Sequence, residues 1–414
     1  MTALAARAVY APNPPLRPRA VAAAGSLNPV VRWAFYFFIL SIPFEMPNRS
    51  IPLEITTITA ALFLLTTPLE YRACFGRVPS ALVWFSVWLW VAIVSGLLQS
   101  GEHALMVLQF LANLLELLLV CWTGSNLMRD RRVFRAALVT LVIACALRAG
   151  MQFLGVGVTA RHVWTGGERE TVFGQNANIS ALILACGLLA AFGVRHAGGW
   201  RVLRSPVVFW PLAGLMASAV VHTGSRGGLL ALTAGLLVLL FRGHTVWQRV
   251  RSGATVLIAM AFLVWAAMRV EMMRNRFEEA AHGGFAGRER IYPALLGMLV
   301  ERPVLGWGPI TNQFELAKRI EEKVKLRRDA HNLVLEVLTT TGFIGLIPFL
   351  TGLSLVALAA WRGRRGSYAI LPVALLATMF MGTMSGTWIA SKILWLVFAC
   401  ALACAPDLTR GRAV

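Results

Sequence analysis

Acidic residues are scarce in this chain of 414 residues, and aspartate is almost absent. The sequence has 19 acidic against 39 basic residues, and its three aspartates are Asp130, Asp329 and Asp407. They are too far apart to form a DxD-type metal motif, and glutamate alone makes a poor site for a hard divalent cation. The sequence therefore predicts chemistry without a bound metal or other cofactor.

Charged residues of both signs make up only 14% of the chain, whereas a soluble domain has nearer a quarter. Hydrophobic residues make up 57%, and apolar runs of roughly 20 residues recur along most of the sequence. These runs lack a polar stripe, which excludes a large soluble helical protein. The formal net charge of +20 lies mainly between the runs, without the interleaved aromatic residues of a nucleic-acid surface.

Several common catalytic and structural motifs are also missing. The six cysteines fall mostly within apolar runs and form no CxxC pair, so neither a disulfide framework nor a cysteine metal site is expected. There is no GxSxG nucleophile and no Walker phosphate loop. The first 27 residues lack a defined apolar core, so we expect the first helix, and not a cleaved signal peptide, to direct insertion.

The apolar runs predict an all-α polytopic membrane protein with about twelve transmembrane helices. The expected ranges are 30–42, 51–67, 80–98, 103–124, 133–154, 174–194, 206–221, 226–241, 253–268, 333–360, 368–382 and 388–404. Arginine is concentrated in every second connector and in both tails, which places both termini in the cytoplasm. The tails are then 1–29 and 405–414. The helices fall into two groups, 30–268 and 332–404.

Two connectors on the outer side are longer and carry charges of both signs: a short loop at 156–173 and a long loop at 269–331. Long loops translocate regardless of charge, so they do not contradict the orientation, and a loop of this length without a function is unusual. Helices are expected at 288–300 and 314–328, the second one amphipathic. The prolines and glycines between 303 and 309 predict a structured turn.

Arginines and one histidine on the outer side are the candidate functional residues. Arg226 opens a helix in Ser225-Arg226-Gly227-Gly228, where the guanidinium and backbone amides can bind an anion. The bland alternative is an arginine at the membrane interface. For Arg161, Arg288 and Arg290 the alternative is ordinary surface charge. His331-Asn332 lies where the long loop re-enters the membrane, and histidine suits proton transfer near neutral pH, although a helix-capping role is equally compatible with the spacing.

These motifs, in their order, resemble the O-antigen ligase and polymerase-like family of GT-C-type membrane glycosyltransferases. The resemblance rests on Phe173-Gly174-Gln175-Asn176-Ala177-Asn178, Ser225-Arg226-Gly227, Arg288 with Tyr292, Arg302-Pro303-Val304-Leu305-Gly306-Trp307-Gly308, and His331-Asn332 followed by Gly342-Phe343-Ile344-Gly345. It covers roughly the C-terminal two thirds of the chain. A choice between Asn176 and Asn178 as a site residue stays open.

The resemblance implies a reaction at the periplasmic face of the bacterial inner membrane. Undecaprenyl-diphosphate-linked O-antigen would donate its glycan, with inversion and without a metal, to lipid A–core oligosaccharide in lipopolysaccharide biosynthesis. His331 would be the general base. Arg161, Arg226, Arg288, Arg290 and Asn332 would bind the diphosphate and substrate. The alternatives are an O-antigen polymerase or a protein O-oligosaccharyltransferase of the same family, and, from another class, a transporter of lipid-linked glycan.

Overall fold

The computed structural model describes residues 27–45, 54–162, 168–197, 200–241, 246–282, 287–321, 326–366, 368 and 370–405. The first helices are α1 (Pro29–Ser41), α2 (Ile55–Thr66), α3 (Tyr71–Phe75), α4 (Ser80–Gln99), α5 (Ala104–Leu127) and α6 (Arg131–Phe153). The hairpin β1 (Val158–His162) and β2 (Glu168–Val172) follows, then α7 (Ala177–His196), α8 (Arg201–Arg204), α9 (Pro206–His222), α10 (Arg226–Leu239) and α11 (Val246–Arg269). The remaining helices are α12 (Glu271–Ala281), α13 (Arg288–Glu301), α14 (Thr311–Arg319), α15 (Leu333–Gly363), α16 (Leu371–Thr383) and α17 (Lys392–Ala403).

The chain is a predominantly helical, polytopic membrane protein. In the described residues, the helices α4, α5, α6, α7 and α15 are long and apolar enough to cross a membrane, and the bent pair α11–α12 makes a sixth candidate. The helices α1, α9, α10, α16 and α17 are apolar but shorter. A total of twelve spans therefore stays a prediction.

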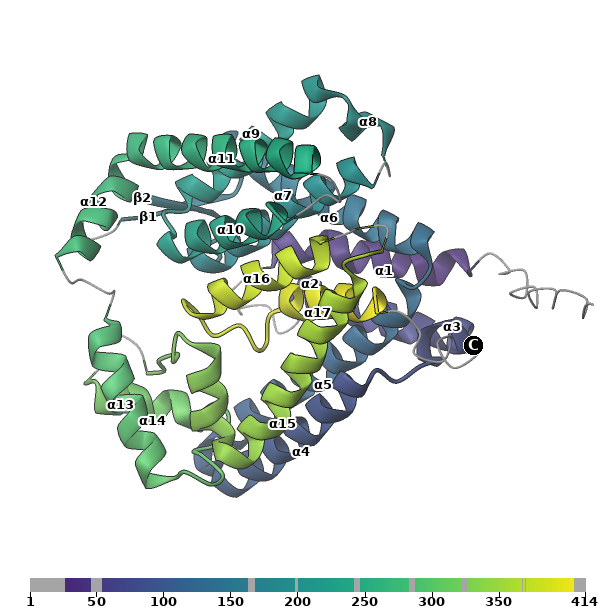
Figure 1. The fold of residues 1–414 in the computed structure, drawn as a ribbon. Helices are drawn as coiled ribbons and strands as arrows, with labels where there is room; N and C mark the ends of the chain where they lie inside the picture. Colours follow the sequence, from purple (N-terminus) through teal and green to yellow (C-terminus); the bar gives the residue numbers. More distant parts are fainter. Residues whose placement is uncertain are drawn as a thin grey trace, which may run out of the picture.

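Helix α7 lies at the centre of the second half of the bundle. In its apolar window 89% of the residues are buried, against 39–56% in the other four long helices. It packs against α6, α9, α10 and α16, while α4 packs along α15 and α5 along α17 (Figure 1). The first turn of α7 is consequently surrounded by the ends of several other helices, which brings loops that are distant in sequence together.

One end of the bundle, which we call the loop end, carries the β1–β2 hairpin and the helices α12, α13 and α14, while α3 and α8 lie toward the opposite end (Figure 1). The helices α6 and α9 finish at the loop end, and α7, α10 and α15 begin there. The alternating direction of these helices agrees with the alternation of connectors read from the sequence. Helix α12, the first part of the long loop, lies beside the β1–β2 hairpin (Figure 1).

Most expected helices occur close to their predicted ranges, but two outer segments differ from expectation. The amphipathic helix expected at 314–328 is present as α14 but is shorter, because it starts at Thr311, ends at Arg319, and residues 326–330 are not helical. The short loop at 156–173 contains a two-stranded antiparallel ladder, with Val158 paired to Val172. The loop at 269–331 also begins with a helix that was not expected, α12, which is bent 95° from the preceding helix.

Helix α15 is broken at Gly342, whose φ of 60° and ψ of −166° are not helical. The turn between α13 and α14 fills this break with backbone hydrogen bonds. Trp307 N donates to Thr339 O at 2.8 Å and Gly308 N to Thr340 O at 2.9 Å. In return, the amides of residues 343 and 344 donate to the carbonyls of residues 303 and 304, at 2.9 and 3.3 Å. We call these four bonds the α15 seam.

The α15 seam explains the glycines of the predicted turn. A Cβ atom on Gly306 would lie 2.5 Å from the Thr339 carbonyl oxygen, and one on Gly342 would lie 2.2 Å from the Val304 carbonyl oxygen. Backbone groups inside an apolar region need hydrogen-bond partners, because no water is available to replace them. The two glycines therefore let two stretches of backbone approach closely enough to satisfy each other.

Candidate functional site

The turn between α9 and α10 is held against the start of α7. Gly224 has a positive φ of 64° and ends α9. Ser225 Oγ accepts from Gly228 N at 2.9 Å, which caps the first turn of α10. The Ser225 hydroxyl in turn donates to Asn178 Oδ1 at 2.7 Å. This bond fixes the first residue of α10, Arg226, at the loop end.

The two glycines after Arg226 allow close helix packing. A Cβ on Gly227 would lie 2.4 Å from Ser385 Oγ, and one on Gly228 would lie 2.2 Å from Ala181 Cβ. The amide of Gly228 is already used by the cap. The expectation that backbone amides approach an anion here stays a prediction.

Arg226 and Arg276 hold each other across the α10–α12 contact. Arg226 Nη1 donates to the backbone carbonyl of Arg276, and Arg276 Nη1 donates to the carbonyl of Gly224 at 2.9 Å. Arg226 also lies 3.8 Å from the Glu279 carboxylate, with only 15% of its side chain exposed. A desolvated guanidinium interacts strongly with an anion because water screens the interaction little. Sequence reasoning missed Arg276, whose helix was expected to be loop.

Two further arginines join this pair. Arg169 on β2 donates from Nε to Thr223 O at 3.0 Å and from Nη2 to Asn178 Oδ1 at 3.3 Å. Arg288, the first residue of α13, is close enough for its charge to act on both Arg226 and Arg276. We call Arg169, Arg226, Arg276 and Arg288 the arginine cluster. Glu279 is the carboxylate that lies beside Arg226 in this cluster, and guanidinium groups are the side chains best suited to binding phosphate oxygens.

Arg161 and Arg290 were expected to help bind the substrate. The structure gives them different positions relative to the arginine cluster. The backbone of Arg161 lies directly opposite Arg169 in the β1–β2 ladder. Arg290 Nη2 donates to the carbonyl of Ile320 at the end of α14, at 2.7 Å. Arg290 thus joins α13 to α14, whereas Arg161 belongs to the strand pair that carries a cluster member.

His331 and Asn332 form the junction between the long loop and α15. His331 has a φ of 53°, which is unusual for a residue other than glycine. Asn332 is the N-cap of α15: its Oδ1 accepts from the amides of Val334 at 3.0 Å and Leu335 at 3.2 Å. The expected capping function therefore belongs to Asn332. Backbone strain of this kind is concentrated at functional positions.

The segment after α16 connects the His331 junction to the arginine cluster. Asn332 Nδ2 lies 3.6 Å from Met384 Sδ. The next residue, Ser385, accepts at its carbonyl from Asn178 Nδ2 at 3.5 Å, and Asn178 also contacts Arg169. Residues from α7, α10, α15 and the end of α16 therefore meet at one place. Of the two asparagines that the motif left open, Asn178 contacts the cluster, while Asn176 caps α7.

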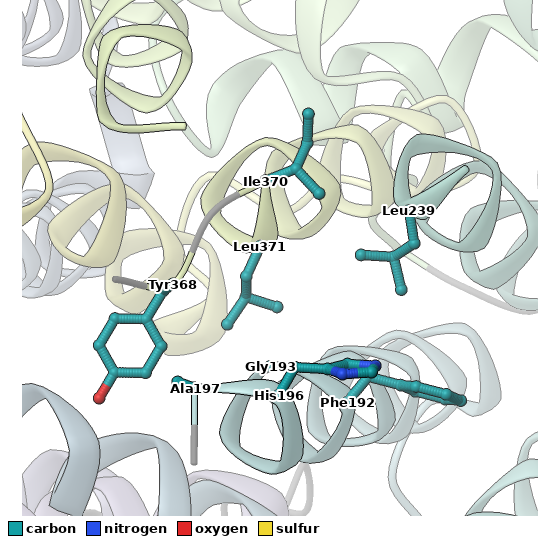
Figure 2. A pocket seen from close by; sticks show the side chains of 8 residues that line it. All are labelled: Phe192, Gly193, His196, Ala197, Leu239, Tyr368, Ile370 and Leu371. Atoms are coloured by element: carbon teal, nitrogen blue, oxygen red, sulfur yellow. The ribbon is translucent and has the colours of Figure 1, made fainter. Parts of the chain in front are cut away.

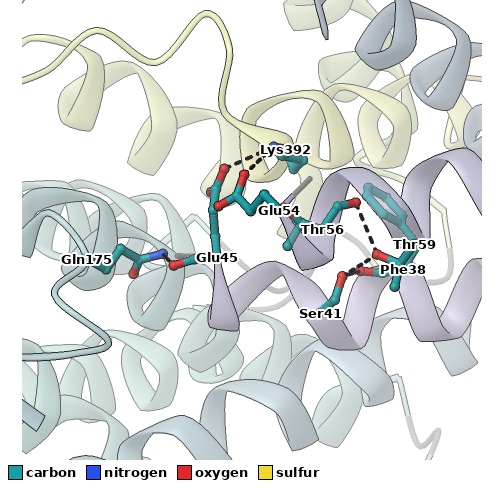
Figure 3. A network of polar contacts seen from close by, with 8 residues as sticks. All are labelled: Phe38, Ser41, Glu45, Glu54, Thr56, Thr59, Gln175 and Lys392. Atoms are coloured by element: carbon teal, nitrogen blue, oxygen red, sulfur yellow. Dashed lines mark hydrogen bonds and ion pairs between the residues drawn. The ribbon is translucent and has the colours of Figure 1, made fainter. Parts of the chain in front are cut away.

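A second buried polar network joins α1, α2 and α17 beside this site (Figure 3). Lys392 Nζ lies 3.1 Å from carboxylate oxygens of both Glu45 and Glu54, with 4% of its side chain exposed. Gln175, in the motif before α7, donates to the Glu45 carbonyl at 3.3 Å. Its oxygen accepts from Arg148, which is fully buried. The network therefore anchors the segment that leads into Asn178.

The pocket in Figure 2 lies at the other ends of three of these helices. It is lined by Phe192, Gly193, His196, Ala197, Leu239, Tyr368, Ile370 and Leu371. These residues come from the end of α7, the end of α10 and the start of α16, whereas the arginine cluster and His331 lie at the loop end. The pocket therefore has no part in chemistry at the arginine cluster.

Comparison with known proteins identifies the region that contains most of this site. Residues 211–350 match the family described as O-antigen ligase, and they include Arg226, Arg276, Arg288 and His331. An O-antigen ligase from Pseudomonas aeruginosa is 27% identical over 267 residues, which are 60% of this chain and 61% of that protein. The chain thus spans about three fifths of the length of that relative. Within residues 211–350, the chain is therefore similar to the O-antigen ligase family.

Proposed function

We propose that this protein is an O-antigen ligase with its active site at the loop end. It transfers the glycan of undecaprenyl-diphosphate-linked O-antigen to a hydroxyl of lipid A–core oligosaccharide, with inversion and without a metal. The protein then lies in the bacterial inner membrane. Its loop end faces the periplasm, and both termini lie in the cytoplasm. The family domain and the relative from Pseudomonas aeruginosa support the activity.

The arginine cluster would bind the diphosphate of the donor. When the anomeric carbon–oxygen bond breaks, negative charge develops on the departing diphosphate, and preorganised cations lower the energy of that state. Arg226 is held by Arg276 and Glu279, so its guanidinium needs little reorganisation as the charge forms. Each charge-assisted hydrogen bond contributes about 1.5–3 kcal/mol. Several such bonds would do here what a divalent cation does in other transferases.

His331 would act as the general base. The hydroxyl oxygen of the acceptor attacks the anomeric carbon, and its proton passes to the imidazole. The bond between the anomeric carbon and the diphosphate oxygen breaks, and its electron pair stays on the departing diphosphate. The observation that carries this proposal is the convergence of the His331 junction and the arginine cluster on Asn178 and the segment 384–385. A base and an anion site must lie near each other for the attacking and leaving oxygens to flank one carbon.

The identity of the acceptor separates this proposal from its alternatives. The purified protein should be reconstituted with lipid-linked glycan and offered lipid A–core, a second lipid-linked glycan or a glycosylatable protein. Transfer to lipid A–core alone is the expected result. Chain elongation would instead identify a polymerase, and transfer to protein an oligosaccharyltransferase. Movement of the donor across the membrane without bond cleavage would refute an enzyme of any of these kinds.

A further inference from the structure

Glu336 lies in the first turns of α15, five residues after His331, and is only 3% exposed. A carboxyl group so well buried at the membrane boundary is costly unless its oxygens are hydrogen-bonded. The proposed reaction assigns it no role. Its hydrogen bonds connect it to the loop segment that precedes α15.

Both oxygens of Glu336 accept hydrogen bonds from the long loop. Oε2 accepts from the backbone amide of Ala330 at 3.3 Å. Oε1 accepts from Asn312 Nδ2 at 3.1 Å, and the same amide group donates to Thr340 Oγ1 at 3.1 Å. The carboxyl group therefore connects the residue immediately before His331 to helix α14.

The backbone of His331 is thereby held from both sides. Ala330 on one side is bound by Glu336, and Asn332 on the other side caps α15. A left-handed conformation at a residue with a Cβ costs about 1–2 kcal/mol, so neighbouring contacts must impose it. The Glu336–Ala330 bond is one of these contacts. It fixes the direction in which the imidazole leaves the chain.

Asn312 is itself held by hydrogen bonds, so Glu336 is bonded to a fixed part of the long loop. Its backbone amide donates to the Gly308 carbonyl at 3.1 Å, and Gly308 belongs to the α15 seam. The amide of Arg328 donates to the Gln313 carbonyl at 3.0 Å, which ties the segment before Ala330 to α14. The support for His331 thus extends through Glu336 and α14 back to α15.

We propose that Glu336 is the positioning residue for His331, holding it in its left-handed conformation through the Ala330 amide and Asn312. This inference rests on the proposed function only in giving His331 its role as base. Glu336 acts as a hydrogen-bond acceptor and takes no proton from the substrate. A side chain that keeps an acceptor for the Ala330 amide should therefore suffice.

Two substitutions separate positioning from proton transfer. Glu336→Leu removes both acceptors at similar volume. Glu336→Gln keeps one oxygen for the Ala330 amide. Its amide group can donate to Asn312 if that side chain turns over, because Asn312 Oδ1 accepts no hydrogen bond within the described residues. Thr341→Val is a matched control, since the Thr341 hydroxyl is equally buried and bonds only to Val337 of its own helix at 2.8 Å.

Two readouts are needed, and one of them is independent of turnover. In Glu336→Leu, amide hydrogen exchange of Ala330 should accelerate by about tenfold, since one buried hydrogen bond is lost. Its kcat should fall by about 10- to 100-fold, with KM for the lipid-linked donor nearly unchanged, since misplacing a base by about 1 Å has effects of this size. Glu336→Gln and Thr341→Val should stay within about threefold of the parent in both measurements.

The outcomes distinguish the inference from the function on which it rests. Equal loss of kcat in Glu336→Gln and Glu336→Leu would show that the ionisable group itself is required, and would overturn the positioning role. Unchanged Ala330 exchange in Glu336→Leu would overturn it as well. If that variant does not fold, Asn312→Ala should show the same two changes to a smaller degree. Full activity of His331→Ala would instead refute the base, while leaving the exchange result intact.

Discussion

Replacing Gly342 with alanine tests the α15 seam, which holds the turn between α13 and α14 against α15. The added Cβ would lie 2.2 Å from the carbonyl oxygen and 2.3 Å from the carbonyl carbon of Val304. Both atoms belong to backbone, so no side-chain rotation can relieve the contact. The variant must also keep a φ of 60° with a ψ of −166°, a region that is essentially restricted to glycine.

The expected loss of stability follows from these two effects. The backbone conformation alone costs a residue with a Cβ on the order of 1–3 kcal/mol. Moving the two backbone segments of the seam apart would relieve the contact but weaken at least two of its four hydrogen bonds. This adds about 1–3 kcal/mol to the loss of stability. At roughly 2 °C per kcal/mol for a chain of this size, the apparent Tm should fall by about 4–12 °C.

The assay is thermal unfolding of the purified protein in detergent, followed by intrinsic tryptophan fluorescence. Gly214→Ala is the matched control, because Gly214 is a helical glycine with no heavy atom within 4 Å of its Cβ position. Its Tm should be unchanged or slightly higher, since alanine is the better helix former. A Gly342→Ala variant with the Tm of the parent would refute the close-approach explanation of the seam.

Three other substitutions test separate parts of the structure. Arg226→Lys should lower the rate of glycan transfer by at least about tenfold, because an ammonium cannot form the two parallel bonds of a guanidinium, and transfer assays would detect this. Lys392→Met should lower Tm, because it leaves two carboxylates facing each other, a loss of about 3–5 kcal/mol for a buried pair. The hydrogen bond from Arg319 holds the pKa of Glu301 below its ordinary value of 4.5. The stability from this pair is therefore present above pH 4.5 and lost as the pH falls through the lowered pKa, so Glu301→Gln should flatten the acid limb of a Tm–pH curve.

Hydropathy gave good bounds for the long helices because an apolar run and its flanking arginines are local features of sequence. The range predicted for α4 was 80–98, and the helix spans Ser80–Gln99. Broken and bent helices were not predictable in this way. The run 333–360 looks continuous, yet α15 breaks at Gly342 because distant residues of the long loop supply replacement hydrogen bonds. Such a break depends on tertiary contacts that no periodicity records.

The candidate site was predicted in part, for a similar reason. Arg226 and Arg288 stand in recognisable motifs at helix starts, and the charge of Arg288 acts on Arg226. Arg276 was missed because α12 carries few apolar residues and was taken as loop. Arg290 was predicted to bind the substrate because of its charge, and in the structure it donates a hydrogen bond to a carbonyl at the end of α14. Which way each side chain points depends on how the hairpin and the three loop helices fold against the bundle.

We propose that the arginine cluster binds the lipid diphosphate and that His331 deprotonates the acceptor hydroxyl, without a metal. Single-turnover transfer of labelled glycan to lipid A–core, by the parent protein and by His331→Ala, in the presence and absence of EDTA, tests it most directly. We predict that EDTA leaves the rate unchanged and that His331→Ala lowers it by at least about 100-fold while donor binding persists. A His331→Ala variant as fast as the parent, or a parent inactivated by EDTA and restored by a divalent ion, would contradict the account.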